Sequence, residues 1–387
     1  MKIVVDSQIM AKACSLASKV IPNKTTLPIL SSLHVSCSVN ALRITASDSE
    51  NWELLDVPAS VELSDAPSSF CISASDITAY LMSIPSQPVT IFLERRGNTD
   101  IYFMSVSHSS GKAEFMVEGS EEYPLVRTID TEGLVVPAEI LRNSIQDARF
   151  AVCNDEELKP NLASVCLDFK GSSMVVAASD GNRLVRMEFP DIEGSNEKIL
   201  LNRKCVSLLM PLLDEVLKDK EAMDDVMIRS NGTNVCLLTG KGCIYSRMTE
   251  LKYPNYDSVI PNKKFREKEA VMNRSDLMSA LKRIMLSASI ASYKVVFSFN
   301  RSNDYVSLVA EDVDFGKAGN EKVKCEYRAE KGLTIALRGT WLKEILSHME
   351  SSEVRFEMID ETRQVLIFEE NGERDMLMLI MPMFLNY

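Results

Sequence analysis

The chain repeats one pattern three times, at a spacing of about 130 residues. The clearest marker is an apolar strand with a small residue near its end, followed by an aspartate. These aspartates are Asp48, Asp180 and Asp312, and successive ones lie 132 residues apart. A unit of this size can bury a core of its own, so the repeat predicts three similar domains rather than a solenoid of short repeats.

Other landmarks recur in the same order within each copy. A capped helix precedes the marker strand, a second helix follows it, and the copy closes with strands joined by a tight turn. The turns lie at Ser110-Gly111, Lys241-Gly242 and Asn371-Gly372, and the copies end at Pro124, Pro254 and Pro382. We expect glycine to supply the positive φ that a tight hairpin turn needs.

Each copy therefore reads as helix, strands, helix, strands. Segments such as 89–93 and 354–358 suit antiparallel sheet, whereas the helices place apolar residues three and four positions apart. The predicted fold class is α+β, used three times. The predicted domains are residues 1–127, 128–262 and 263–387.

Residues that carry chemistry are sparse. The three histidines, His34, His108 and His348, have no second histidine or cysteine at metal-ligand spacing, so we predict no metal site. The sequence has no glycine loop for phosphate and no local pairing of a nucleophile with a base, so we predict no cofactor and no enzymatic activity. An enzyme assembled from residues distant in sequence is the third hypothesis for function.

Cysteine usage and hydropathy bear on the compartment. Nine cysteines are scattered without a Cys-x-x-Cys pair, which indicates reduced, mostly buried thiols rather than a disulfide framework. No apolar stretch reaches the roughly 18 residues that a membrane-spanning helix needs. Asp6 stands where a secretory signal would be apolar. We expect a cytoplasmic protein without a membrane partner.

The net charge of −12 is unevenly distributed along the chain. The first helices of the three copies, residues 9–20, 140–152 and 277–289, together carry +5, which leaves −17 for the rest. Their cations are Lys12, Lys19, Arg142, Arg149, Lys282 and Arg283. A cationic surface repeated on an acidic protein suits a uniform polyanion, namely double-stranded DNA bound without regard to sequence. The alternative is that these side chains only keep exposed helix faces soluble.

Four motifs in order make the chain resemble the bacterial DNA polymerase III beta subunit (sliding clamp) family over essentially its whole length. They are Thr26-Leu27-Pro28-Ile29-Leu30, Ala178-Ser179-Asp180-Gly181-Asn182-Arg183-Leu184, Tyr253-Pro254-Asn255-Tyr256 and Met381-Pro382-Met383. The resemblance implies the DNA clamp fold. Two chains would join head to tail as a homodimer, with antiparallel sheets outside and helices lining a ring of six domains. It also implies a non-catalytic processivity factor of DNA replication that encircles duplex DNA and tethers the polymerase.

The resemblance further implies an apolar groove between the second and third domains. Its ligands would be short peptides of the DNA polymerase III alpha subunit, the clamp loader, and other replication and repair proteins. The implied groove residues are Leu162, Ser179, Gly181, Arg183, Leu184, Pro254, Val259, Gln364, Met381, Pro382, Met383 and Leu385. Arg183 would anchor a peptide carbonyl or acid in an adaptable apolar pocket. On composition alone, the terminal methionines would instead be ordinary core residues.

Further expectations follow from the same resemblance. Lys24, in the loop after the first helix, would contact DNA, unless it is simply a solvated lysine. At the ring interface, Ala113 and Phe115 would meet Met285 and Leu286 of the second chain. The chain departs from the common family pattern at Asn182, Asp257-Ser258, Phe384 and the Asn386-Tyr387 extension. These departures predict a different peptide preference. An interaction scaffold that binds peptides without encircling DNA is the alternative function.

Overall fold

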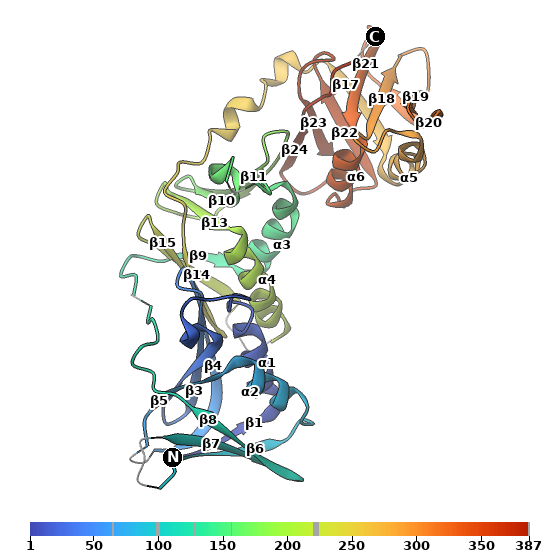
Figure 1. Cartoon of the computed structure of the whole chain (residues 1–387). Coiled ribbons are helices and arrows are strands. Elements are labelled where there is room, and N and C mark those ends of the chain that lie inside the picture. Colours follow the sequence, from blue (N-terminus) through green and yellow to red (C-terminus); the bar gives the residue numbers. More distant parts are fainter. Residues whose placement is uncertain (64–65, 98–100, 127, 156, 220–223, 386–387) are drawn as a thin grey trace. The chain divides into compact units, whose positions relative to one another are not determined.

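The computed structural model describes residues 1–63, 66–97, 101–126, 128–155, 157–219 and 224–385 (Figure 1). The chain forms two compact units. Unit 1 comprises Met1–Arg142 and Leu201–Glu250, and unit 2 comprises Asn143–Leu200 and Leu251–Tyr387. The second repeat is therefore shared, because one part of it packs with the first repeat and the other part with the third. The Asn386-Tyr387 extension lies outside the described residues.

The three repeats have the same order of elements, which confirms the predicted α+β fold. Each consists of a strand, a helix, four strands, a second helix and three strands. In the first repeat these are β1 (Lys2–Asp6), α1 (Ser7–Ala17), β2 (Ser32–Cys37), β3 (Ala41–Ser47), β4 (Asn51–Glu62), β5 (Ser69–Ser73), α2 (Ala74–Met82), β6 (Pro88–Arg95), β7 (Tyr102–His108) and β8 (Gly111–Val117).

The second repeat consists of β9 (Leu134–Pro137), α3 (Ala138–Ala148), β10 (Ser164–Phe169), β11 (Ser173–Ser179), β12 (Arg183–Pro190), β13 (Lys198–Asn202), α4 (Arg203–Lys218), β14 (Asp225–Ser230), β15 (Asn234–Thr239) and β16 (Gly242–Arg247). The third consists of β17 (Lys268–Asn273), α5 (Arg274–Ile284), β18 (Lys294–Phe299), β19 (Tyr305–Asp312), β20 (Lys317–Tyr327), β21 (Leu333–Arg338), α6 (Gly339–Ser347), β22 (Glu353–Met358), β23 (Val365–Glu369) and β24 (Met376–Ile380). Short 3-10 helices lie at Pro28–Ser31, Arg149–Ala151, Pro160–Leu162, Tyr256–Val259, Lys263–Phe265 and Met285–Ser287.

Polar side chains at the joints between strand and helix explain where the helices begin. The Asp6 carboxylate accepts hydrogen bonds from the main-chain amides of Gln8 and Ile9, at 2.9 and 3.1 Å. Asn202 and Asn273 cap α4 and α5 in a similar way. Each cap gives a partner to a main-chain amide that the first helical turn leaves without one. The starts of these three helices are thus determined locally by the sequence.

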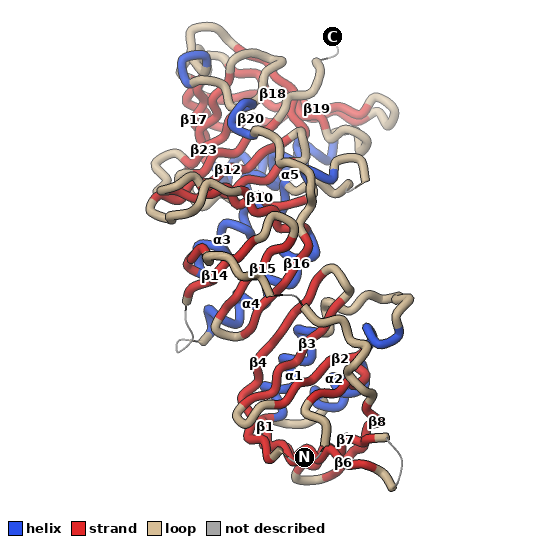
Figure 2. Tube along the Cα trace, turned by 90° about the vertical axis from the view of Figure 1, so that its left-hand side faces the viewer, coloured by secondary structure: helices blue, strands red, loops and turns tan. Residues whose placement is uncertain are grey.

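In unit 1 the long strand β4 pairs with β3 and also belongs to two further ladders. Its first half pairs with β16, where Trp52 lies opposite Tyr245, and its second half pairs with β1, where Ala59 lies opposite Val5. Helices α1 and α2 pack against each other, and α1 packs on β3 and β4 (Figure 2). The buried face of α1 consists of Ser7, Met10, Ala11, Ala13, Cys14 and Ala17.

Unit 2 contains the strands that correspond to β4 in the second and third repeats, namely β12 and β20. Strand β12 pairs with β24, where Leu184 lies opposite Leu379. The end of β20 pairs with β17, where Tyr327 lies opposite Ala270. The first half of β20 pairs with β19 on one side, and no described strand pairs with its other side. Strand β8 of unit 1 is likewise an edge within the described chain.

The turn chemistry differs from the prediction at two of the three hairpins. Gly242 has φ +151°, and a Cβ at this position would lie 2.2 Å from the carbonyl oxygen of Leu54, so glycine is required here. At the last hairpin the positive φ, 56°, belongs to Asn371 rather than to Gly372. Asparagine tolerates this region better than most residues. The prediction was wrong at Ser110-Gly111, where neither residue has a positive φ.

The cysteines match the prediction from their spacing. All nine are free thiols, and eight of them are buried. Within the described ranges, no helix has the length and apolar character needed to cross a membrane.

Candidate functional sites: an apolar groove and three cationic helices

Unit 2 carries an apolar groove that encloses a cavity of about 170 Å³. Its walls come from the turn between β11 and β12, the segment after Tyr253, and the end of β24. The lining residues are Leu162, Ser179, Gly181, Asn182, Arg183, Leu184, Tyr253, Pro254, Asn255, Tyr256, Val259, Leu379 and Met381. The fold thus brings together segments that are more than 200 residues apart in the sequence.

The turn between β11 and β12 is shaped by its own polar side chains. Ser179 Oγ donates to the Arg183 carbonyl at 2.8 Å and accepts from the Gly181 amide at 3.1 Å. The Asp180 carboxylate accepts from the amides of Asn182 and Arg183 at 2.8 and 3.0 Å. Gly181 has φ +90°, a backbone conformation that residues other than glycine adopt only at a cost in free energy. The motif around Asp180 therefore encodes this wall locally.

The floor of the groove is part of a hydrophobic cluster. Cys166, Leu184, Tyr253 and Leu379 are buried in it, and Met381 packs against it from the rim. Burial raises the pKa of the Cys166 thiol to about 12 and raises the pKa of Tyr253 as well. Both groups are therefore neutral at physiological pH, and the floor presents no charge to a ligand.

Charges at the rim are paired with one another. Asp257 lies 2.9 Å from Lys170 Nζ and 3.3 Å from Arg186 Nε. Burial opposes ionisation of Asp257, but the hydrogen bonds and charges of these two cations outweigh it and lower the pKa of the carboxyl. Tyr256 donates its hydroxyl to Asp168 at 2.6 Å. The acid at position 257 therefore adds little net charge to the groove.

Arg183 lines the cavity, and its guanidinium already has partners within the chain. Its three guanidinium nitrogens donate to Asp180 at 2.9 Å, Glu344 at 2.5 Å and the Phe150 carbonyl at 3.0 Å. The residue is only 8% exposed, and its guanidinium lies over the rings of Phe150 and Trp341. Arg183 thus joins the second and third repeats at the groove, and each of its guanidinium nitrogens is held by a partner within the chain.

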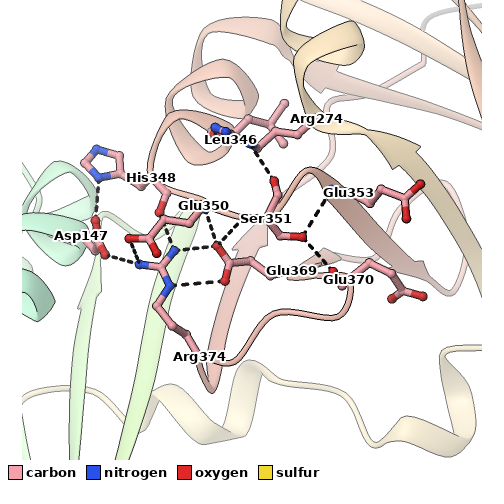
Figure 3. Close-up of polar contacts among 10 residues, drawn as sticks. All are labelled: Asp147, Arg274, Leu346, His348, Glu350, Ser351, Glu353, Glu369, Glu370 and Arg374. Atoms are coloured by element: carbon pink, nitrogen blue, oxygen red, sulfur yellow. Dashed lines mark hydrogen bonds and ion pairs between the residues drawn. The ribbon is translucent and has the colours of Figure 1, made fainter.

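A polar network next to this arginine joins the same two repeats (Figure 3). Asp147 of α3 pairs with Arg374 at 2.8 Å and with His348 Nδ1 at 3.2 Å. Arg374 also pairs with Glu369 at 2.6 Å. The His348 ring stacks on Phe150 with 4.4 Å between centroids. Partly buried charges therefore join the two repeats whose residues line the groove.

Other predicted groove residues lie outside the cavity lining. Gln364 lies at the rim, where its Nε2 donates to the Val259 carbonyl at 2.6 Å. The Met383 amide instead donates to the Ala336 carbonyl of β21 at 2.8 Å, and Pro382 and Leu385 do not line the cavity either. Phe384 is 90% exposed. The sequence interpretation missed Leu379, Asn255 and the two tyrosines, although three of these stand in a motif that the resemblance used.

The cations predicted to face DNA, which include Lys24 in the loop after the first helix, fall into two groups. Lys12 pairs with Glu215, Arg142 pairs with Asp214 at 3.0 Å, and Arg283 holds Glu321 through two bonds of 2.7 and 2.8 Å. The sequence interpretation did not foresee these acids. The second group forms no ion pair within the described chain and consists of Lys19, Lys24, Arg149 and Lys282, all of which are exposed.

Of the residues expected at a ring interface, one pair lies on the open edge strand β8, and the other lies in the 3-10 helix after α5, which contacts β19 and β20. Ala113 and Phe115 are half-buried on β8, and the Phe115 ring packs edge-on against Tyr80 with 5.4 Å between centroids. Met285 and Leu286 follow α5, and Leu286 is 75% exposed.

Comparison with known proteins decides the family. The DNA polymerase III beta subunit N-terminal domain matches residues 1–127, and the C-terminal domain of the same subunit matches residues 257–384. The chain belongs to the DNA polymerase III beta subunit family. This family consists of sliding clamps, which are non-catalytic processivity factors of DNA replication.

Sliding clamps resemble the chain over its whole length. The beta sliding clamp of Synechocystis sp. is 26% identical over 395 residues, and that of Bacillus subtilis is 24% identical over 394, each covering 99% of both chains. The DNA polymerase III beta subunit structures from Pseudomonas aeruginosa and Thermotoga maritima share the fold. Their TM-scores are 0.88 and 0.85, with 20% and 24% identity and full coverage of both chains.

Proposed function

We propose that two copies of this sliding clamp close head to tail into a ring that encircles duplex DNA, and that the groove of unit 2 holds peptides of replication partners. The observation that supports the ring is a pair of strand edges that have no partner within the described chain, namely β8 and the first half of β20. The chain twice joins strands of these same two types within itself, as β4 with β16 and as β12 with β24. A third joint of this kind, formed between chains, gives a closed dimer by symmetry.

The internal joints also predict the register of the joint between chains. Trp52 and Leu184 lie opposite Ser47 and Ser179 within their hairpins. The residue in the same position of β20 is Ala318, which lies opposite Glu311. Tyr245, opposite Trp52, is the third residue after Gly242, and the third residue after Gly111 in β8 is Glu114. Glu114 should therefore lie opposite the partner's Ala318, with Phe115 beside the same joint.

Cross-linking tests this register. We expect Glu114→Cys with Ala318→Cys to give a covalent dimer with a short thiol-specific cross-linker, whereas either single variant should not. Nicked circular DNA should retain the cross-linked ring, and linearising that DNA should release it. Monomers that fail to cross-link, or equal release from circular and linear DNA, would contradict the ring.

The exposed cations of the first helices support contact with phosphate. Lys19, Lys24, Arg149 and Lys282 are free to meet a polyanion, and contact with phosphates alone lets a ring slide along DNA. The acid partners of Lys12, Arg142 and Arg283 weaken this surface. That weakening favours the alternative, a peptide-binding scaffold that does not encircle DNA, and retention on circular DNA distinguishes the two.

The groove supports capture of a short apolar peptide, in which side chains enter the cavity between Leu162, Val259 and Met381. The proposed partners are the polymerase III alpha subunit, the clamp loader and other clamp-binding proteins in the cytoplasm. A solved clamp of Pseudomonas aeruginosa is bound to griselimycin, which makes this compound a useful competitor. Val259 is 48% exposed, so Val259→Asp should keep the fold and abolish binding of the alpha subunit without dissociating the dimer. Unchanged binding would refute the groove assignment.

A further inference from the structure

The junction between the first and second repeats, within unit 1, contains residues that match those of the groove by strand register. Strand register relates the two places: Trp52 lies opposite Tyr245 as Leu184 lies opposite Leu379. Beneath them, Cys236 and Cys243 form an apolar cluster with the partly buried Leu54 and Tyr245. Tyr123-Pro124 follows the first repeat just as Tyr253-Pro254 follows the second, and both tyrosines are buried.

Two residues make this surface differ from the groove. Trp52 replaces the smaller Leu184, and its indole Nε1 donates to the Pro124 carbonyl at 2.9 Å. This bond ties the segment that leaves the first repeat to β4. Six residues after Tyr123 stands Ile129, which is 5% exposed in the apolar cluster, whereas its counterpart Val259, six after Tyr253, is 48% exposed on the groove wall.

We propose that this surface is a groove closed by the chain itself, because Trp52 is bonded to Pro124 and Ile129 is buried in the apolar cluster. Each chain then offers one peptide site, and a closed dimer offers two. The proposal rests on the proposed function of the open groove, because the two surfaces are compared as binding sites. The class of ligand that Trp52 excludes is the same apolar peptide that the open groove accepts.

The physical reason lies in the size of residue 52 and in its hydrogen bond. A leucine at this position would leave the space of an indole ring, and the Pro124 carbonyl would lose its donor. The chain on either side would then be held by the buried side chains of Tyr123 and Ile129, and an apolar peptide can replace the second of these in the apolar cluster. Trp52 is thus a residue that determines how many peptides one chain can bind.

Calorimetric titration of the full chain tests the proposal. The probe is the tightest-binding peptide from a set tiled along the polymerase III alpha subunit. We expect one peptide per wild-type chain and none for Val259→Asp. Trp52→Leu should bind two, and Trp52→Leu with Val259→Asp should bind one.

Other outcomes have distinct meanings. Two peptides per wild-type chain, or one per folded Trp52→Leu chain, would overturn the closure by Trp52 and leave the open groove intact. No binding to wild type would overturn the open groove and this proposal with it. Hydrogen exchange on wild-type protein needs no variant: saturating peptide should protect β12 and β24 but not residues 128–130. Protection of residues 128–130 would also contradict the closure.

Discussion

Asp147 of α3 and Arg374 of the turn before β24 form an ion pair of 2.8 Å that joins the second and third repeats. Their side chains are 16% and 29% exposed, so the pair is shielded from water on most sides. Arg374 also neutralises Glu369 at 2.6 Å. Removing the arginine would leave two partly buried carboxylates that face each other without a cation.

We therefore expect Arg374→Ala to lower the free energy of unfolding by about 2 kcal/mol, the scale for a charged group that loses its partner. Urea unfolding measures this, with Arg301→Ala, an exposed arginine of the same repeat, as the control. Peptide affinity should fall with Arg374→Ala as well, because the pair joins the two repeats whose residues line the groove. An equal decrease in the free energy of unfolding in both variants would show that the junction does not depend on this ion pair.

Glu53 predicts an unusual dependence of stability on pH. It is 1% exposed on β4, and neither carboxylate oxygen has a hydrogen-bond partner among the described residues. Burial raises the pKa of Glu53 to about 7, although the charges of Lys19 and Lys204 act in the opposite direction. The folded protein therefore holds a proton that the unfolded chain releases near pH 4.5.

Stability from this group is fully present below about pH 4.5 and is lost as the pH rises through 7. The loss amounts to about 3 kcal/mol, because the free energy changes by about 1.36 kcal/mol for each pH unit between the unfolded and folded pKa values. Glu53→Gln should remove this component and be the more stable protein at pH 8. Thermal unfolding between pH 5 and 8 measures it, with exposed Glu132→Gln as the control. Parallel curves for wild type and Glu53→Gln would contradict the raised pKa.

The pairing of Lys12 with Glu215 predicts that an acid restrains contact with DNA. Glu215→Gln frees the ammonium of Lys12 and removes one negative charge from α4. The affinity for DNA should rise, and the slope of log affinity for DNA against log salt concentration should steepen by about one. Lys19→Ala should make that slope shallower by about one. Exposed Glu361→Gln, in a loop of the third repeat, should change neither, and equal effects of Glu361→Gln and Glu215→Gln would refute the local explanation.

The sequence predicted what is encoded locally and missed what pairs at long range. The helix cap at Asp6 and the turn at Asp180 are formed by residues within three positions, so their motifs can be recognised without a structure. Arg183 bonds to Glu344, 161 residues away, and no pattern around either residue signals that bond. The open groove was predicted through family motifs, whereas its closed counterpart at Trp52 required the strand register.

Replacing Gly181 should weaken peptide binding as well as lower the stability of the fold. It has φ +90°, and a Cβ there would lie 2.9 Å from Lys159 Nζ, which donates to the Asp180 carbonyl. Gly171 has φ +72°, and a Cβ there would meet nothing closer than 3.9 Å. Both alanine variants should lose about 1 kcal/mol of stability from the left-handed backbone. Only Gly181→Ala should also displace the lysine at the groove, so its peptide affinity should fall by about tenfold while Gly171→Ala binds as wild type. Calorimetry on both variants decides this, and equal affinities would show that Lys159 can move aside without entering the groove.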